Sequence, residues 1–130
     1  MTTLAAQHRD ENVAMSATKG KDSERAVDVY FSADVETDGP IPGPFSILSF
    51  ALVYAGAFDG KQFAPPQDYT RTFYRELKPI SENFQPEALR VNGLDRDRLL
   101  SDGEAPQLAM TEACRWIKGI ACPPSASHRC

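Results

Sequence analysis

Two acidic residues, Asp34 and Glu36, have the type and spacing that metal chemistry requires. They end an alternating segment, and residues i and i+2 of a strand project from one face with Cα atoms about 6.5–7 Å apart. Two such carboxylates repel each other unless a cation lies between them, and hard oxygen donors suit Mg²⁺ or Mn²⁺. The pair predicts a metal site. The simpler interpretation is two solvated acids at a strand end, because Asp-x-Glu alone is a short pattern.

The segments around this pair read as strands joined by loops. In Val27–Glu36 apolar and polar residues nearly alternate, which predicts a half-buried strand. Thr37–Pro44 holds two glycines and three prolines and predicts an irregular loop. Phe45–Tyr54 is the most apolar segment and predicts a strand covered on both faces. The Ala55–Asp68 connection is expected to be a long, elaborated hairpin loop.

The later residues predict one more strand and two helices. Tyr69–Leu77 mixes β-branched and aromatic residues with charge, which is typical of an edge strand. Pro86–Val91 predicts a short helix that stops at Gly93. A longer helix is expected to begin near Glu104 and to end near Gly119. Its apolar face would consist of Ala105, Leu108, Ala109, Ala113, Trp116, Ile117 and Ile120.

The chain of 130 residues has room for one domain. Residues 1–26 lack apolar periodicity and predict a disordered tail, 27–120 form the folded part, and 121–130 an irregular C-terminal segment. The net charge of −4 argues against non-specific duplex binding, but not against gripping a nucleic-acid end through metal ions. No apolar run is long enough for a membrane span. The three cysteines, spaced by eight residues, predict free thiols and a cytoplasmic location.

Three segments together resemble one family. Asp34-Val35-Glu36-Thr37 resembles motif I of the DEDD-type (DnaQ-like) 3′-5′ exonucleases, a branch of the ribonuclease H-like superfamily. Ser46–Val53 resembles the family's second strand, and Glu87–Leu94 resembles its helix that ends in Asn/His-Gly-Ile/Leu. The resemblance covers Val27 to about Ile120. It implies a partial α/β ribonuclease H-like exonuclease fold, with three N-terminal strands in sequential antiparallel order and helices on one face.

The resemblance also implies an activity, namely 3′-5′ hydrolysis at nucleic-acid ends, DNA or RNA, with two Mg²⁺ or Mn²⁺ ions about 3.5–4 Å apart. Asp34 and Glu36 would then be catalytic metal ligands. Thr37 would contact the 3′-terminal nucleotide, or else serve as a turn residue. Phe45 would stack on the terminal base, or else pack in the core. Asp38 is the weaker acid candidate, because alternation turns it into the loop.

The sequence departs from the family in its second half. The family needs two further acids and a catalytic His or Tyr, and none of them can be placed; His128 is expected to be an exposed terminal residue. Asp95 and Asp97 read as solvated loop acids. The chain thus resembles the N-terminal half only, which leaves open a non-catalytic interaction module or a truncated inactive fragment. The open edge of the first strand predicts self-association.

Overall fold

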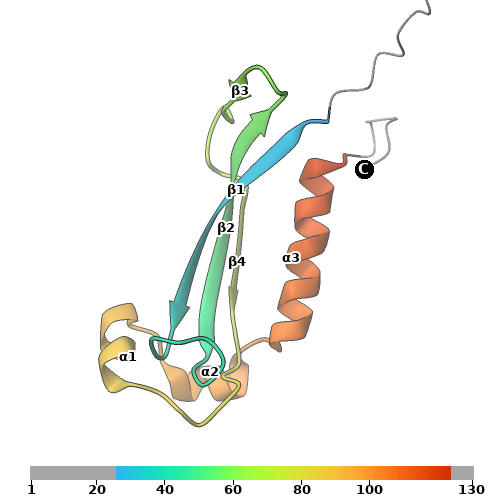
Figure 1. Ribbon diagram of the computed structural model, residues 1–130. Coiled ribbons are helices and arrows are strands. Elements are labelled where there is room, and N and C mark those ends of the chain that lie inside the picture. Colours follow the sequence, from blue (N-terminus) through green and yellow to red (C-terminus); the bar gives the residue numbers. More distant parts are fainter. Residues whose placement is uncertain (1–25, 124–130) are drawn as a thin grey trace, which may run out of the picture.

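The computed structural model describes residues 26–123, with a long sheet, one helix beside it and two helices at one end (Figure 1). The strands are β1 (Asp28–Thr37), β2 (Ile47–Phe58), β3 (Phe63–Ala64) and β4 (Thr72–Glu76). The helices are α1 (Pro86–Asn92), α2 (Arg96–Asp102) and α3 (Pro106–Ala121). The predicted tail lies outside the described residues except for residue 26, and so does the predicted C-terminal segment beyond residue 123.

The sheet is antiparallel and has β2 at its centre. β1 pairs with one edge of β2, while β3 and β4 pair with the other, so the predicted sequential order of the three main strands is confirmed. β2 runs four residues past Tyr54, because Ala57 and Phe58 find partners in β3. This addition falls in the segment expected to be loop. The turn that follows β2 is closed by the Asp59 carboxylate, which accepts the Lys61 and Gln62 amides at 2.8 Å each.

Helix α3 covers one face of the sheet and makes the core. The buried cluster joins the sheet to α3 and consists of Phe50, Phe73, Leu77, Ala109 and Ala113, with Ile47, Leu52 and Trp116 packed against it. Burying a large apolar side chain stabilises a fold by about 1.5–3 kcal/mol, so this cluster holds α3 in place. The prediction of Leu108 on the packed face is wrong. Its side chain is 53% exposed, because the contact line runs through the two alanines and Trp116.

An aromatic chain ties α3 to two strands at once. The Trp116 ring lies 5.5 Å from Phe31 of β1 and 5.8 Å from Phe73 of β4, measured between ring centroids. Phe50 of β2 continues the chain at 5.7 Å from Phe73. Such tilted aromatic pairs add about 0.5–1.5 kcal/mol each beyond the area they bury. The docking of α3 therefore spans the sheet from its β1 side to its β4 side.

The two short helices lie at the end of the sheet where β1 stops, so the expectation of all helices on one face holds for α3 alone (Figure 1). Helix α1 begins at Pro86 and ends before Gly93, whose φ of 69° suits a glycine C-cap. Helix α2 was not predicted. Asp95 caps it by accepting the Arg98 amide at 3.1 Å, and Asp97 lies in its first turn. Both acids therefore start a helix, where negative charge is favourable, instead of lying in a loop.

One edge of the sheet has no partner in the part of the chain that the structure describes. There β1 pairs with β2 and with no other strand. Val27, directly before this strand, and Tyr30 and Val35 within it are each about half exposed. Unpaired backbone groups beside exposed apolar side chains are a template for pairing with another strand.

The two cysteines in the described part of the chain differ in their bonding. Cys114 is free and exposed, whereas Cys122 is disulfide-bonded, so the prediction of free thiols is confirmed for the first and wrong for the second. Among residues 26–123, no helix combines the length and apolarity needed to cross a membrane.

Candidate metal and nucleic-acid site

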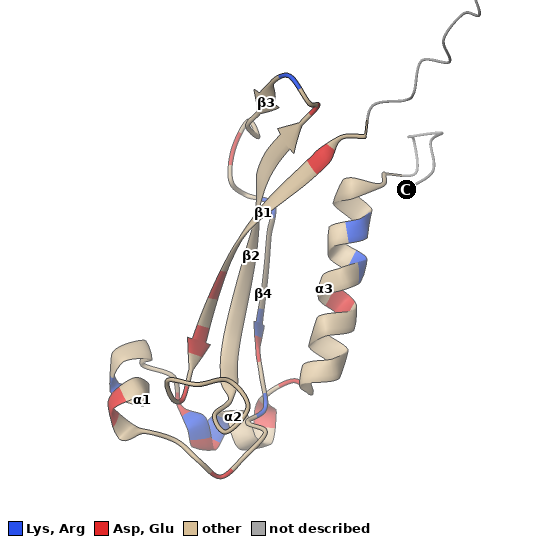
Figure 2. Cartoon of the chain, in the orientation of Figure 1, with Lys and Arg blue, Asp and Glu red and all other residues tan. Residues whose placement is uncertain are grey.

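Asp34 and Glu36 lie on the sheet face opposite α3. Phe31, three residues before Asp34, points to α3, and alternation sends the two acids to the other side. Figure 2 shows acidic residues on β1 toward the end that meets α1. Asp34 is exposed and Glu36 is half-buried. Within residues 26–123 neither carboxylate forms an ion pair or a hydrogen bond, so both are available to a ligand.

A third acid on the same face is already compensated. Glu36 pairs across the sheet with Ser49, which in turn pairs with Glu76 of β4. The Glu76 carboxylate forms a salt bridge with Arg98 at 2.7 Å and accepts a hydrogen bond from the Tyr74 hydroxyl at 3.2 Å. The uncompensated negative charge in this row of the sheet therefore comes from β1.

The donor set fits one hard cation. The two carboxylates supply oxygen ligands, and Mg²⁺ is usually held by one or two carboxylates, with water and substrate phosphate completing the shell. No group of three or more His, Cys, Asp or Glu side chains is placed to hold a metal in the described part of the chain.

A groove of about 350 Å³ lies between the end of β1 and α1, and Glu36 but not Asp34 lines it. This volume is at the lower end of the range for small-molecule sites. The lining is part polar and part apolar, and consists of Val35, Glu36, Thr37, Gly39, Pro40, Gln85, Glu87, Ala88, Val91 and Asn92. Among residues 26–123 no Lys or Arg lines the groove, and of its two acids Glu87 forms an ion pair with Arg90. A phosphate entering the groove therefore meets the unpaired Glu36 carboxylate and needs a cation between them.

Thr37 lines the groove, whereas Phe45 does not. The Thr37 hydroxyl donates to the Gly39 carbonyl at 2.9 Å, so part of its hydrogen-bonding capacity is used within the turn. The Phe45 ring is packed against Gly39, so closely that a Cβ on that glycine would come within 2.2 Å of the ring. Phe45 is half-buried on the far side of Gly39 and is absent from the groove lining. Of the four predicted residues, Glu36 and Thr37 thus share the groove and Asp34 adjoins it along β1.

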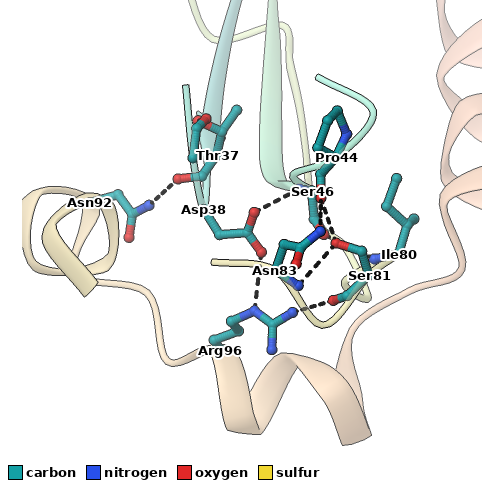
Figure 3. A network of polar contacts seen from close by, with 10 residues as sticks. Thr37, Asp38, Pro44, Ser46, Ile80, Ser81, Asn83, Asn92 and Arg96 are labelled. Carbon is teal, nitrogen blue, oxygen red and sulfur yellow. Dashed lines mark hydrogen bonds and ion pairs between the residues drawn. The ribbon is translucent and has the colours of Figure 1, made fainter. Parts of the chain in front are cut away.

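Three polar residues that hold this arrangement were missed by sequence reasoning. The side-chain amide of Asn92 in α1 donates to the Thr37 carbonyl at 3.0 Å, and the backbone N–H of Gln85 donates to the backbone carbonyl of Asp38 at 2.7 Å. Arg96 of α2 forms an ion pair with the buried Asp38 at 3.0 Å (Figure 3). Asn92 was visible only as part of a helix-ending signature, and Arg96 lies between Asp95 and Asp97, which the sequence predicts to be solvated loop acids.

Comparison with known proteins shows one relative by sequence. No family model matches it. The 3′-5′ DNA exonuclease Cap18 of Escherichia coli is 40% identical to it over 93 residues. The chain is homologous to 3′-5′ exonucleases. This DnaQ-like, DEDD-type homology covers 72% of the chain, which spans 44% of the length of that relative.

One solved structure supports the α/β fold. The crystal structure of cell-death related nuclease 4 matches 72% of this exonuclease homologue with a TM-score of 0.52 and 18% identity. The match spans 31% of that nuclease chain. A product-bound structure of exonuclease I matches 71% of the chain at 18% identity, with a TM-score of 0.47 and 20% of its own length covered. The first match confirms the predicted partial exonuclease fold.

Proposed function

We propose that this chain binds a nucleic-acid 3′ end, of DNA or RNA, through a divalent cation held by Asp34 and Glu36, as part of a 3′-5′ exonuclease site. One observation carries the proposal: two uncompensated carboxylates adjoin a groove at the end of β1, in a homologue of 3′-5′ exonucleases. The acidic lining gives the cation a necessary role, because phosphate alone would be repelled.

Each residue of the site has a proposed task. Asp34 and Glu36 would hold Mg²⁺ or Mn²⁺, which when bound neutralises phosphate charge and polarises water for phosphodiester hydrolysis. Thr37 would face the terminal nucleotide from the groove wall. The apolar Val35 and Val91 would contact its base, since nucleobases bury their faces on apolar surfaces. Phe45 packs against Gly39 and would support it, and its stacking on the terminal base stays a prediction.

Mn²⁺ binding tests the metal site directly. Titration of the purified protein followed by the electron paramagnetic resonance signal of free Mn²⁺ should reveal one site. Asp34→Asn and Glu36→Gln should each weaken it by about ten-fold or more, since even outer-shell changes in metal sites cost that much. Asp28→Asn, at the other end of β1, is the matched control and should leave the affinity unchanged. Equal affinities in all four proteins would contradict the proposal.

Oligonucleotide binding tests the second part. A fluorescent single strand with a free 3′ hydroxyl should bind in Mg²⁺ or Mn²⁺ and be released by a chelator. A strand whose 3′ end is blocked by a phosphate should bind more weakly, because the groove is short and acidic. Binding that ignores both the chelator and the 3′ end would refute the proposed mode.

A non-catalytic binding module is the second candidate function. It is favoured by the absence of a third metal-binding side chain within residues 26–123. Hydrolysis needs groups that act as a unit, and losing part of such a unit abolishes far more than a proportional share of the rate. We therefore expect the 130-residue chain to bind a labelled 3′ end without trimming it. Trimming that Asp34→Asn abolishes would decide for the enzyme.

Two further elements belong to the proposal. The unpaired edge of β1, with its exposed apolar side chains, supports self-association of the chain. The cytoplasmic location expected from the sequence stays a prediction.

A further inference from the structure

Beneath the groove lies a buried ion pair that the proposed function does not use. The side chains of Asp38 and Arg96 are 0% and 6% exposed, and their nearest charged atoms are 3.0 Å apart. One Asp38 oxygen accepts the Arg96 Nε–H, and the other accepts the Ser46 amide at 2.6 Å (Figure 3). Both oxygens therefore already accept a hydrogen bond from another segment of the chain.

The pair joins segments that are far apart in sequence. The Asp38 amide donates to the Ser46 carbonyl at 3.0 Å, so two bonds to Ser46 close the loop between β1 and β2. The Asp38 carbonyl accepts the Gln85 amide just before α1. Arg96 reaches from α2 and also donates to the Ser81 carbonyl. The Asp38 carboxylate itself, two residues after Glu36, thus bonds to Ser46 and Arg96, and the Asp38 backbone bonds to Ser46 and Gln85.

Stability alone is a poor reason for such a pair. Removing two charges from water is costly, and replacing a buried ion pair by apolar residues is often neutral or stabilising. A fork-shaped guanidinium does, however, fix the direction and distance of its partners. Here those partners are Asp38, directly after β1, and Ser81, in the segment that leads into α1. The end of β1 and α1 are the two walls of the groove.

We propose that Asp38 and Arg96 are positioning residues, which fix the end of β1 against α1 and thereby set the geometry of the carboxylates and the groove. This inference rests on the proposed function, since it concerns the same site. It predicts that the site weakens when the pair is broken, although neither side chain touches the ligand.

The sign of one measurement separates positioning from simple electrostatics. Arg96→Met removes a positive charge near the two acids, so electrostatics alone would tighten Mn²⁺ binding. Positioning requires the opposite, a loss of about ten-fold in Mn²⁺ affinity, as for other outer-shell groups. Arg98→Met is the matched control: it removes the same charge two positions along α2 and should leave the affinity unchanged or tighter. Arg96→Lys, which keeps the charge but loses the fork, should fall between Arg96→Met and the wild type.

Hydrogen exchange supplies a readout that does not need the metal. The measurement uses Arg96→Met or Arg96→Lys, whichever variant circular dichroism shows to be folded. In that variant the backbone amides of Ser46 and Gln85 should exchange about ten-fold faster than in the wild type. Amides of the β2–β4 ladder, such as Leu52, should keep their protection if the fold is intact.

The outcomes distinguish the two proposals. If wild-type Mn²⁺ binding depends on Asp34 and Glu36 but Arg96→Met binds as tightly or more tightly, the positioning inference is wrong and the metal site stands. If the wild type binds no Mn²⁺, the proposed function fails, and unchanged exchange at Ser46 and Gln85 would overturn the positioning inference as well. Faster exchange confined to these two amides would support it.

Discussion

Replacing Asn92 by alanine should destabilise the fold through two hydrogen bonds at the end of α1. The Asn92 side chain donates to the Thr37 carbonyl at 3.0 Å and accepts the Leu94 amide at 2.9 Å, both partly buried. Each bond contributes about 1 kcal/mol net, so the loss should be about 2 kcal/mol. For a folded unit of roughly 100 residues this corresponds to a fall in Tm of roughly 8–16 °C, measured by thermal and urea unfolding.

Two further variants make the Asn92 test specific. Asn92→Asp keeps an acceptor for the Leu94 amide but loses the donor and sets a carboxylate against the Thr37 carbonyl, so it should destabilise at least half as much. Asn83→Ala removes one exposed bond to Pro44, at 3.2 Å, and should change the free energy of unfolding by less than about 0.5 kcal/mol. If Asn92→Ala were as mild as Asn83→Ala, the link between α1 and β1 would not stabilise the fold.

Three other outcomes are expected. Gly103→Ala should lower the free energy of unfolding, measured in urea, by about 2–3 kcal/mol, because its Cβ would lie 2.5 Å from the Leu99 carbonyl oxygen. Gly119→Ala in α3 is the control: its Cβ meets nothing within 4 Å, so it should raise the free energy of unfolding by about 0.5–1 kcal/mol. A harmless Gly103→Ala would contradict this packing. Hydrogen bonds from the Gln62 and Lys61 amides lower the pKa of Asp59 in the folded protein. The stability that Asp59 contributes is therefore present above the pKa of the unfolded chain and is lost as the pH falls through the folded pKa. An NMR titration that finds the ordinary aspartate pKa for Asp59 would refute this. Sedimentation should reveal self-association through the open edge of β1. The association should strengthen with salt, because salt screens the repulsion between the β1 acids of two copies, and Tyr30→Lys should weaken it. A monomer at every protein and salt concentration would argue against association through this edge.

The local parts of the fold could be predicted because their causes are local. Alternation placed Asp34 and Glu36 on one face of a strand, and Pro86 and Gly93 marked the two ends of a short helix. The DEDD-like motif identified the family before any contact was known. What a side chain does within a few residues of its own position is written in spacing and residue type.

The supporting contacts could not be predicted because their causes are distant. Arg96 is buried only because Asp38, 58 residues earlier, neutralises it, and no pattern near Arg96 announces that partner. Helix α2 was missed for the same reason: a charged run with Asp95 before it reads as solvent-exposed until its packing is known. The ring of Phe45 turned out to pack on Gly39, a contact that depends on how the loop folds back.

The aromatic chain across the sheet makes the single tryptophan a reporter of one event. Trp116 is the sole tryptophan of the sequence, and its ring packs on Phe31 and Phe73, which belong to different strands. Its emission maximum and near-ultraviolet dichroism should therefore follow the docking of α3, independently of the groove at the far end of the sheet. Comparing this signal with amide exchange at Ser46 would tell whether the helix-covered half and the α1–α2 end unfold together or as separate cooperative units.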